Sequence, residues 1–279
     1  MSIIKNEYRL RHRSRNIVIQ ATLAVCLCLM SSCLVLEGSD QAVVYTVSPG
    51  QGLTSLQIHN SFQVKVQAGS QNRFEFRVDD NLRAFVDARE EEPGEWTLRL
   101  LPGVDYKPKN LTVTVTVNSI ERLIVNEDAS VEVSGFNTLS APIKIMMSDS
   151  AKLRWKGRVE VNTELNLELK DETQVEFEHI VLTPTAKAIC RCQGGQLAMS
   201  GTGNSFSLSA KQQHKANLKE FVVQNMDVEL SETSTAEVNA VKTLSVSLFD
   251  RTFLLYNGNP EVTIKVKNRE ATLTQQPEN

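Results

Sequence analysis

The fold of this chain is decided by residues 126–201, which read NEDASVEVSGFNTLSAPIKIMMSDSAKLRWKGRVEVNTELNLELKDETQVEFEHIVLTPTAKAICRCQGGQLAMSG. Four times within this stretch, a polar turn is followed by two apolar residues with one residue between them. The first apolar residues of the four pairs are Val131, Leu153, Val175 and Leu197, and the second are Val133, Trp155, Phe177 and Met199. Each pair therefore begins 22 residues after the previous one.

This spacing predicts the fold class. A fixed period of about 20 to 50 residues is typical of stacked repeats, and alternating apolar and polar residues indicate that each repeat is made of strands. We therefore predict an all-β chain, a β-solenoid or parallel β-helix-like stack of short strands with rungs of about 22 residues. Equal positions of successive rungs would then lie about 4.8 Å apart, with both apolar columns pointing inward.

The flanking sequence also has the pattern of strands. Alternation begins near Leu56 and is strong in residues 112–117, which are almost purely Val and Thr. Residues 82–89 are predicted as a strand, and the part of the chain beyond residue 52 shows no convincing helical period. After Gly203 the step of 22 loosens, and residues 207–218 fit it only weakly.

The first 32 residues have a different character. Four arginines lie between residues 9 and 15, an apolar run follows over 17–30, and Ser31-Ser32 precede Cys33. A basic segment, a short apolar run and small residues are typical of a secretory signal. The Ser-Ser-Cys ending is similar to the lipobox of bacterial lipoproteins, so we predict lipidation of Cys33. The alternative is an uncleaved membrane-spanning helix over 17–36. Both interpretations anchor the chain to a membrane, with the remainder outside the cytoplasm.

These features predict the domain organisation and exclude one class of partner. Residues 1–32 form a signal peptide, 33–52 a linker, 53–274 the solenoid domain and 275–279 a polar tail. The solenoid domain divides into an N-terminal β part, 53–120, and repeat rungs, 121–274. The chain has 30 basic and 33 acidic residues, and the signal holds five of the basic and one of the acidic, so the rest has a net charge of about −7. No basic stripe for nucleic acid remains.

Two cysteines outside the signal, Cys190 and Cys192, are two apart in a predicted strand, so their side chains share a face. A structural zinc site needs four ligands, and the remaining histidines (59, 179 and 214) are scattered along the chain. No metal or cofactor site is predicted here. The cysteines are interpreted as buried small apolar residues or as a bridge between neighbours.

The acids of the repeat turns, Asp128, Asp149 and Asp171, are the main candidates for chemistry. Carboxylates stacked in successive rungs could bind Ca²⁺, which prefers several oxygen ligands. Aspartate in a turn also hydrogen-bonds its own backbone and tolerates tight conformations. The turn-forming interpretation is favoured because the glycine-rich calcium repeat is absent and the fourth turn has Gly194-Gly195 in place of the acid.

No catalytic motif is present: the sequence lacks a Gly-x-Ser-x-Gly elbow, a P-loop and a dinucleotide fingerprint. Carboxylates such as Glu176 and Glu178 alternate with apolar residues and are interpreted as a solvated strand face. Trp155 falls in an inward column, so it is predicted to lie in the core and not on a sugar-binding surface. We therefore predict a protein that is not an enzyme, with a glycan-active β-helix enzyme as the alternative.

The sequence resembles one known family. The residues that carry the resemblance are Phe62-x-Val64-x-Val66-x-x-Gly69, then Asp80-Asn81-Leu82, and near the C-terminus Tyr256-Asn257-Gly258-Asn259-Pro260. They are similar to the GIN-domain family, the auto-transporter adhesin head domains of secreted bacterial proteins, over roughly 53–274. The resemblance implies a β-solenoid and a secreted or membrane-anchored location. With the predicted anchor, it leads us to expect an adhesion, binding or structural surface of the bacterial cell envelope with a glycan or protein ligand. An envelope sensor or accessory lipoprotein is a further alternative.

Overall fold

The computed structural model describes residues 35–49 and 52–277, in two units. The smaller unit pairs strand β1 (Val35–Glu37) in parallel with β8 (Asp105–Lys107). The larger unit comprises residues 38–101 and 108–279. The predicted signal peptide and Cys33 lie outside the described residues. Within the described ranges, no helix is both long enough and apolar enough to cross a membrane.

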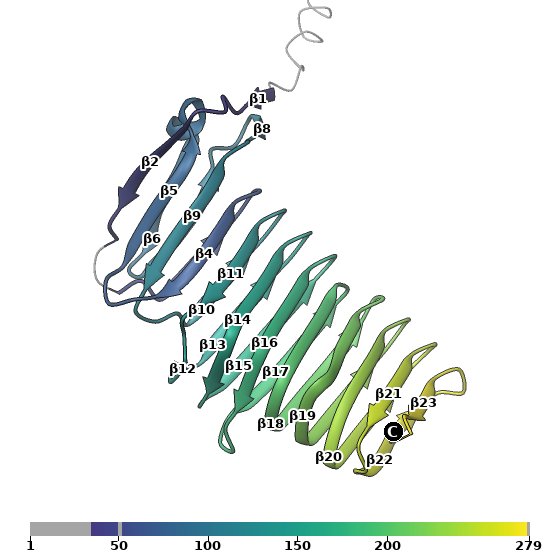
Figure 1. Ribbon diagram of the computed structural model, residues 1–279. Helices are drawn as coiled ribbons and strands as arrows, with labels where there is room; N and C mark the ends of the chain where they lie inside the picture. The colour runs from purple at the N-terminus through teal and green to yellow at the C-terminus, as the bar shows by residue number, and fades with distance from the viewer. Residues whose placement is uncertain (1–34, 50–51, 278–279) are drawn as a thin grey trace, which may run out of the picture. The chain divides into compact units, whose positions relative to one another are not determined.

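The larger unit is a β-solenoid of about seven turns, which confirms the predicted fold class (Figure 1). Its strands lie on three faces, and neighbouring rungs pair in parallel. The strands of the first face are β7 (Glu95–Leu100), β3 (Ser55–Ile58), β10 (Arg122–Val125), β13 (Ile143–Met147), β15 (Glu164–Lys170), β17 (Lys187–Gln193) and β22 (Glu261–Lys267). Those confined to the second face are β9 (Leu111–Val117), β4 (Gln63–Ala68), β11 (Ser130–Ser134), β21 (Phe253–Asn257) and β23 (Thr272–Gln275).

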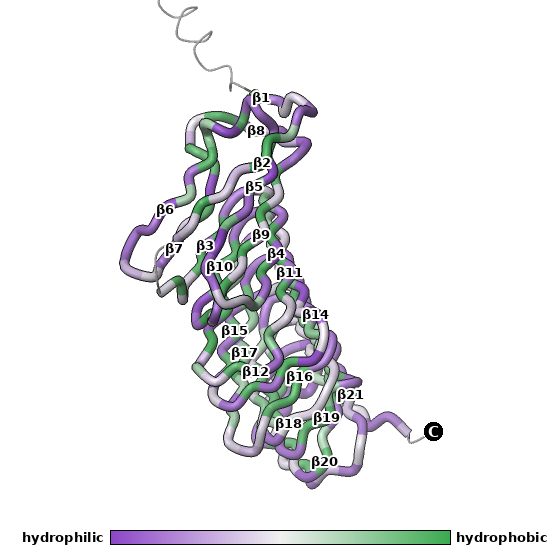
Figure 2. The backbone as a smooth tube through the Cα atoms, turned by 60° about the vertical axis from the view of Figure 1, so that its left-hand side comes forward, coloured by the Kyte–Doolittle hydropathy of each residue, from purple (hydrophilic) through white to green (hydrophobic). Residues whose placement is uncertain are grey.

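Longer strands turn from one face to the next. β14 (Lys152–Val161) and β16 (Gln174–Leu182) begin on the second face, and an irregularity in their pairing leads them into a short third face, where β12 (Thr138–Leu139) joins them. Three strands continue through all three faces: β18 (Gln196–Lys211), β19 (Lys215–Leu230) and β20 (Thr235–Leu248). The alternation of hydrophilic and hydrophobic residues along these strands is visible in Figure 2.

The pairing register confirms both predicted apolar columns. Leu153 of β14 pairs with Val131 of β11 and Val175 of β16, and the next column passes through Trp155. All eight column residues are buried. Trp155 is 1% exposed and stacks on Phe177 with ring centroids 5.7 Å apart, which confirms its predicted place in the core.

The loosened period after Gly203 is a shorter step and not a loss of the fold. Leu197 pairs with Ala216, 19 positions on, and Ala216 pairs with Ala236, 20 positions on. The change begins between the third and first faces. Ile180 and Ala188 are eight positions apart, whereas the residues paired with them, Gly201 and Phe206, are five apart. The loop at this corner has lost three residues while the paired strands keep their register.

The N-terminal end of the larger unit is closed by antiparallel strands. β5 (Arg73–Asp79) lies between β2 (Ala42–Val47) and β9, and β6 (Val86–Glu92) forms a hairpin with β7. A 3₁₀ helix, η1 (Asp80–Phe85), connects β5 to β6. Phe74, Phe76 and Leu82 are completely buried behind these elements.

Two predictions for this region were wrong. The predicted linker, 33–52, contains β2, whose Val/Tyr alternation was overlooked because breakers surround it. The predicted strand at 82–89 begins as η1, because Asp80-Asn81 starts a turn. The predicted N-terminal β part, 53–120, is continuous with the repeat rungs, since β3 and β4 already pair in parallel with the rung strands β10 and β11.

Candidate functional site

The acidic turns of the repeats stack in one column between the first and second faces. Glu127, Asp149 and Asp171 adopt left-handed backbone conformations, with φ of 59°, 62° and 57°. The Asp149 carboxylate accepts the Glu127 backbone N–H at 3.1 Å, and that of Asp171 accepts the Asp149 N–H at 3.3 Å. The Glu127 carboxylate does the same for the Asn60 N–H at 3.1 Å. Each carboxylate thus satisfies a donor in the preceding turn.

The sequence prediction placed Asp128 in this column, and that was wrong by one residue. The step of 22 leads from Asp149 back to Glu127, which the prediction missed because it considered only aspartates. At the fourth turn, where Gly194 replaces the acid, Asp171 N–H donates instead to the Gln193 carbonyl at 2.8 Å. The ladder returns near the C-terminus, where the Glu232 N–H donates to Asp250 at 2.9 Å.

The geometry gives these acids a turn-forming role. Aspartate at positive φ with its carboxylate on a backbone N–H is the behaviour expected of a turn residue. Among residues 35–49 and 52–277, no three side chains of the His, Cys, Asp and Glu types are grouped so that they could hold a metal ion. The acids therefore stabilise the stack.

Cys190 and Cys192 point into the core from β17 as reduced thiols, 0% and 3% exposed, with their sulfur atoms 2.9 Å apart. His214, from the turn before β19, is also completely buried and donates through Nδ1 to the Gly194 carbonyl at 2.7 Å. Burial raises the pKa of Cys190 well above its ordinary value. Burial would also raise the pKa of Cys192, but the adjacent Cys190 and His214 side chains outweigh it and lower that pKa to about 6. This buried group is closed to ligands.

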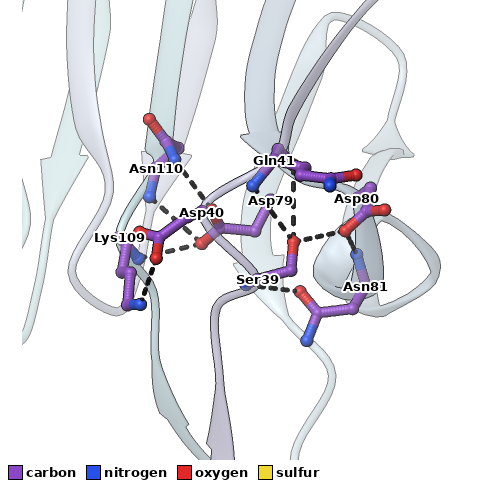
Figure 3. Close-up of polar contacts among 8 residues, drawn as sticks. All are labelled: Ser39, Asp40, Gln41, Asp79, Asp80, Asn81, Lys109 and Asn110. Atoms are coloured by element: carbon purple, nitrogen blue, oxygen red, sulfur yellow. Dashed lines mark hydrogen bonds and ion pairs between the residues drawn. The ribbon is translucent and has the colours of Figure 1, made fainter.

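A polar cluster at the N-terminal end is the other dense group of side-chain hydrogen bonds. Figure 3 shows its members: Ser39, Asp40, Gln41, Asp79, Asp80, Asn81, Lys109 and Asn110. Buried Asp79 accepts the backbone N–H groups of Lys109 and Asn110 at 2.8 and 3.1 Å, and the Asn110 amide at 2.8 Å. Burial acts to raise the pKa of Asp79, and these hydrogen bonds outweigh it and hold the pKa below the ordinary value of 3.8.

All three of these hydrogen bonds to the Asp79 carboxylate are made inside the cluster. The Asp79 carboxylate joins the end of β5 to the start of β9. Lys109 Nζ donates to the carboxylate of Asp40, which precedes β2 in the chain, at 2.6 Å. Asp80 and Asn81, which contributed to the family resemblance, accept hydrogen bonds from Ser39, in the segment that precedes β2. The Ser39 hydroxyl donates to Asp80, and the Ser39 backbone N–H donates to Asn81. These residues clamp the antiparallel cap through hydrogen bonds and one ion pair.

An open groove of about 790 Å³ runs along the outer surface of the second face. It crosses seven consecutive strands, from Ser130 and Glu132 on β11 to Phe253 and Leu255 on β21. Because successive strand residues point alternately into and out of the solenoid, the groove floor consists of the outward positions that separate the inward apolar columns. We name this feature the second-face groove.

Two columns of side chains form the floor of the second-face groove. The register places Lys152, Gln174, Gln196, Lys215, Thr235 and Phe253 in one column, and Arg154, Glu176, Ala198, Asn217, Glu237 and Leu255 in the other. Ala198 is small and leaves a dip between its longer neighbours. At the C-terminal end of the groove, both columns become apolar, and Phe253 is 42% exposed.

Ion pairs organise the N-terminal half of the groove. Arg154 lies 3.4 Å from Glu176 and 3.0 Å from Glu178, and Lys156 lies 2.8 Å from Glu132. These side chains are about half exposed, so the pairs contribute little to stability. They do fix the positions of donors and acceptors along the groove. The sequence prediction interpreted Glu176 and Glu178 as a solvated face; the alternation itself could have shown that these outward positions form a continuous column.

Comparison with known proteins gives the family. Residues 52–260 match the family described as "Putative auto-transporter adhesin, head GIN domain". No curated protein matches the chain.

Solved structures share the fold. A "putative adhesin" from Parabacteroides merdae ATCC 43184 is 12% identical with a TM-score of 0.75, covering 88% of this chain and 100% of that one. Another from Parabacteroides distasonis ATCC 8503 is 14% identical with a TM-score of 0.74, covering 87% and 100%. A "putative lipid binding protein" from the same strain is 12% identical with a TM-score of 0.69, covering 86% and 96%. At these identities, the likeness shows the fold. The family match covers most of the chain and confirms the resemblance seen in the sequence, so the protein belongs to the "Putative auto-transporter adhesin, head GIN domain" family.

Proposed function

We propose that this chain is a membrane-anchored binding module of the bacterial cell envelope, exposed outside the cytoplasm and not an enzyme. The adhesin description of its family and the names of its structural neighbours support an adhesion-like role. The Ser31-Ser32-Cys33 sequence after a basic and apolar segment supports a lipid anchor.

The observation that carries the proposal is the second-face groove. It extends across seven rungs at a spacing of about 4.8 Å, so it suits a long, thin partner better than a compact one. Solenoids use such extended surfaces for recognition. The partly paired charges and the amides of the groove present donors and acceptors in a regular series along its length.

The groove chemistry favours a glycan chain as the partner. Gln174, Gln196 and Asn217 offer amides, which can both donate to and accept from sugar hydroxyl groups. The exposed ring of Phe253 can pack against the apolar face of a sugar at the end of the groove. An extended peptide is the competing occupant, since it would also follow the rungs.

A glycan array probed with the full-length chain tests this proposal. We expect binding to oligosaccharides, and a loss of about tenfold or more in affinity for Phe253→Ala and for Gln196→Ala. The matched control is Val241→Ala, because Val241 is 41% exposed, almost as much as Phe253, but does not line the groove.

Two results would overturn the proposal. One is an array without binding combined with capture of an extended peptide, and the other is binding that is insensitive to both groove substitutions. Release of shorter sugars from a bound glycan, measured by chromatography, would support the enzyme alternative. In that case Glu176→Gln and Glu237→Gln would show which groove carboxylate takes part.

A further inference from the structure

Two lysines of the second-face groove have no counter-charge. Lys152, on β14, and Lys215, on β19, are exposed, line the groove and make no ion pair within the described residues. The register places Gln174 and Gln196 between them in the same column. This part of the column therefore contains two positive charges and no carboxylate. A charge that the protein leaves unpaired at a binding surface favours a ligand of opposite charge.

The carboxylates of the adjacent column leave these two charges uncompensated. Glu176 is paired with Arg154 at 3.4 Å, and Glu132 is paired with Lys156 at 2.8 Å. Glu237 makes no ion pair within the described part of the chain, but it lies one rung beyond the second lysine. The middle of the groove is thus locally positive, on a chain that has more acidic than basic residues.

The pairing register fixes the separation of the two charges. Lys152 pairs with Gln174, Gln174 with Gln196, and Gln196 with Lys215, so three rung steps separate the lysines. At about 4.8 Å a step, their Cα atoms lie about 14 Å apart along the groove. A ligand with one anionic group beside each lysine must therefore extend over three rungs.

The groove between and beyond the lysines presents neutral contacts. The amides of Gln174 and Gln196 can both donate to and accept from sugar hydroxyl groups. Ala198, on the same strand as Gln196, forms the dip in the groove floor. The exposed ring of Phe253 lies two rungs beyond Lys215. This order of contacts fits an oligosaccharide whose acidic groups are separated by neutral, hydroxyl-rich units.

Lysine accepts more than one kind of anion. Its ammonium group is a compact point charge, without the planar fork with which arginine matches a particular anion geometry. Arg154, which also lines the groove, is already engaged by Glu176 and Glu178. The carboxylate of a uronic acid and a sulfate ester on a hexose therefore both suit Lys152 and Lys215.

We propose that the second-face groove selects acidic oligosaccharides, with one anionic group beside Lys152, another beside Lys215 and neutral groups over the two glutamines between them. The inference rests on the proposed glycan-binding function and adds the class of glycan. It also makes charge and length act together, because a short acidic sugar meets one lysine, whereas a longer one meets both.

Isothermal titration calorimetry of the full-length chain in detergent tests the inference. The probes are hexamers of uronic acids, sulfated hexose hexamers and neutral hexose hexamers of the same linkages. We expect at least one acidic kind to bind about tenfold or more tightly than its neutral counterpart, and the two acidic kinds show which anion is preferred. The difference should shrink as sodium chloride rises from about 0.05 to about 0.5 M, because salt screens exposed charges. Disaccharides of the preferred acid should bind about tenfold more weakly than its hexamers.

Substitution of the lysines tests their part. Lys152→Gln and Lys215→Gln should each weaken binding of the acidic hexamer about threefold to fivefold, and the double variant about tenfold or more. Neither should change the affinity for a neutral hexamer more than about twofold, because neutral sugars have no charge to pair. The matched control is Lys242→Gln, since Lys242 is exposed and does not line the groove. Circular dichroism would confirm that all variants keep their strand content.

Three outcomes overturn the inference. They are neutral hexamers that bind as tightly as acidic ones, acidic binding that survives the double substitution, and tighter binding of a hexaglutamate peptide than of any hexasaccharide. The first leaves the proposed function intact if glycan binding is still sensitive to Phe253→Ala. Absence of binding by every hexamer also overturns the inference, and the glycan array then decides the proposed function separately.

Discussion

The carboxylate of Asp149 accepts a hydrogen bond from the backbone N–H of Glu127, 22 positions earlier in the chain, at 3.1 Å. The same carboxylate accepts from the hydroxyl of Ser148 at 2.8 Å. Asp149→Ala should therefore lower the free energy of unfolding by about 1–2 kcal/mol, through the lost bonds and the strain of alanine at positive φ. Urea unfolding followed by circular dichroism would measure it.

Two further substitutions isolate the cause. Asp149→Asn keeps an acceptor and tolerates the left-handed conformation, so it should cost less than about 0.5 kcal/mol. Asp128→Ala changes the neighbouring acid, which lies outside the ladder, and should also stay within about 0.5 kcal/mol. Equal losses for Asp149→Ala and Asp128→Ala would contradict the ladder.

A pair of glycines tests the close approach of rungs at the corner between the second and third faces. Gly201 has φ of 121°, and a Cβ there would collide with the backbone carbonyl of Ile180. Gly157 also has positive φ, 76°, but a Cβ there would have open space around it. Gly201→Ala should cost about 3 kcal/mol or more and Gly157→Ala about 1 kcal/mol. Similar melting temperatures for the two variants would show that the backbone at this corner can move apart and accommodate the added Cβ.

The lowered pKa of Asp79 predicts that the free energy of unfolding decreases in acid. Its pKa in the folded protein lies below the ordinary 3.8, so its contribution is fully present above that value and is lost as pH falls through the folded-state pKa. At pH 7, Asp79→Asn should reduce the free energy of unfolding by about 2–3 kcal/mol. The difference from the unsubstituted chain should shrink toward pH 2. A difference that stays constant from pH 7 to pH 2 would contradict this, and Asp128→Asn is the exposed control.

Cys192 should titrate far from an ordinary thiol. Its pKa of about 6 predicts a rise in thiolate absorbance at 240 nm near that pH. The rise should be absent from Cys192→Ser and move to higher pH in His214→Ala, because the imidazole helps to lower the pKa. A step near pH 6 that persists in Cys192→Ser would assign it to another group.

Cys33→Ser tests the predicted lipid anchor. The substitution removes the only cysteine that directly follows Ser31-Ser32, so acylation should be lost and the chain should be released from the membrane fraction or mislocalised. Membrane fractionation with metabolic labelling by a fatty acid would measure both effects. Unchanged acylation and membrane retention would exclude Cys33 as the lipid attachment site.

The repeat sequence was enough to predict the solenoid and its core. Val131, Leu153 and Val175 recur at one step, and a parallel stack requires equal positions to superpose. That prediction depended on constancy of the step, so it weakened after Gly203, where the corner loop shortens but the paired strands stay in register.

The candidate site was harder to predict from the sequence than the fold. The ladder position of Glu127 was missed because only aspartates were considered, although the step of 22 leads to it, and the shared left-handed backbone conformation shows that Glu127 and Asp149 are equivalent. The second-face groove consists of residues with no shared type, such as Gln196 and Phe253, which the register alone places in one column. The side chains of His214 and Cys192 interact, although no sequence motif links the two residues.

The position of the cap has a consequence for the order in which the chain folds. Beyond residue 117, every strand on the first and second faces pairs with a strand that precedes it in the chain. The first segments of the larger unit to be synthesised can thus complete a closed platform from β2 to β9. Each later segment of about 20 residues then finds its template already in place, so folding can proceed by addition in the order of arrival. A chain stalled during synthesis would present a finished surface with one growing edge.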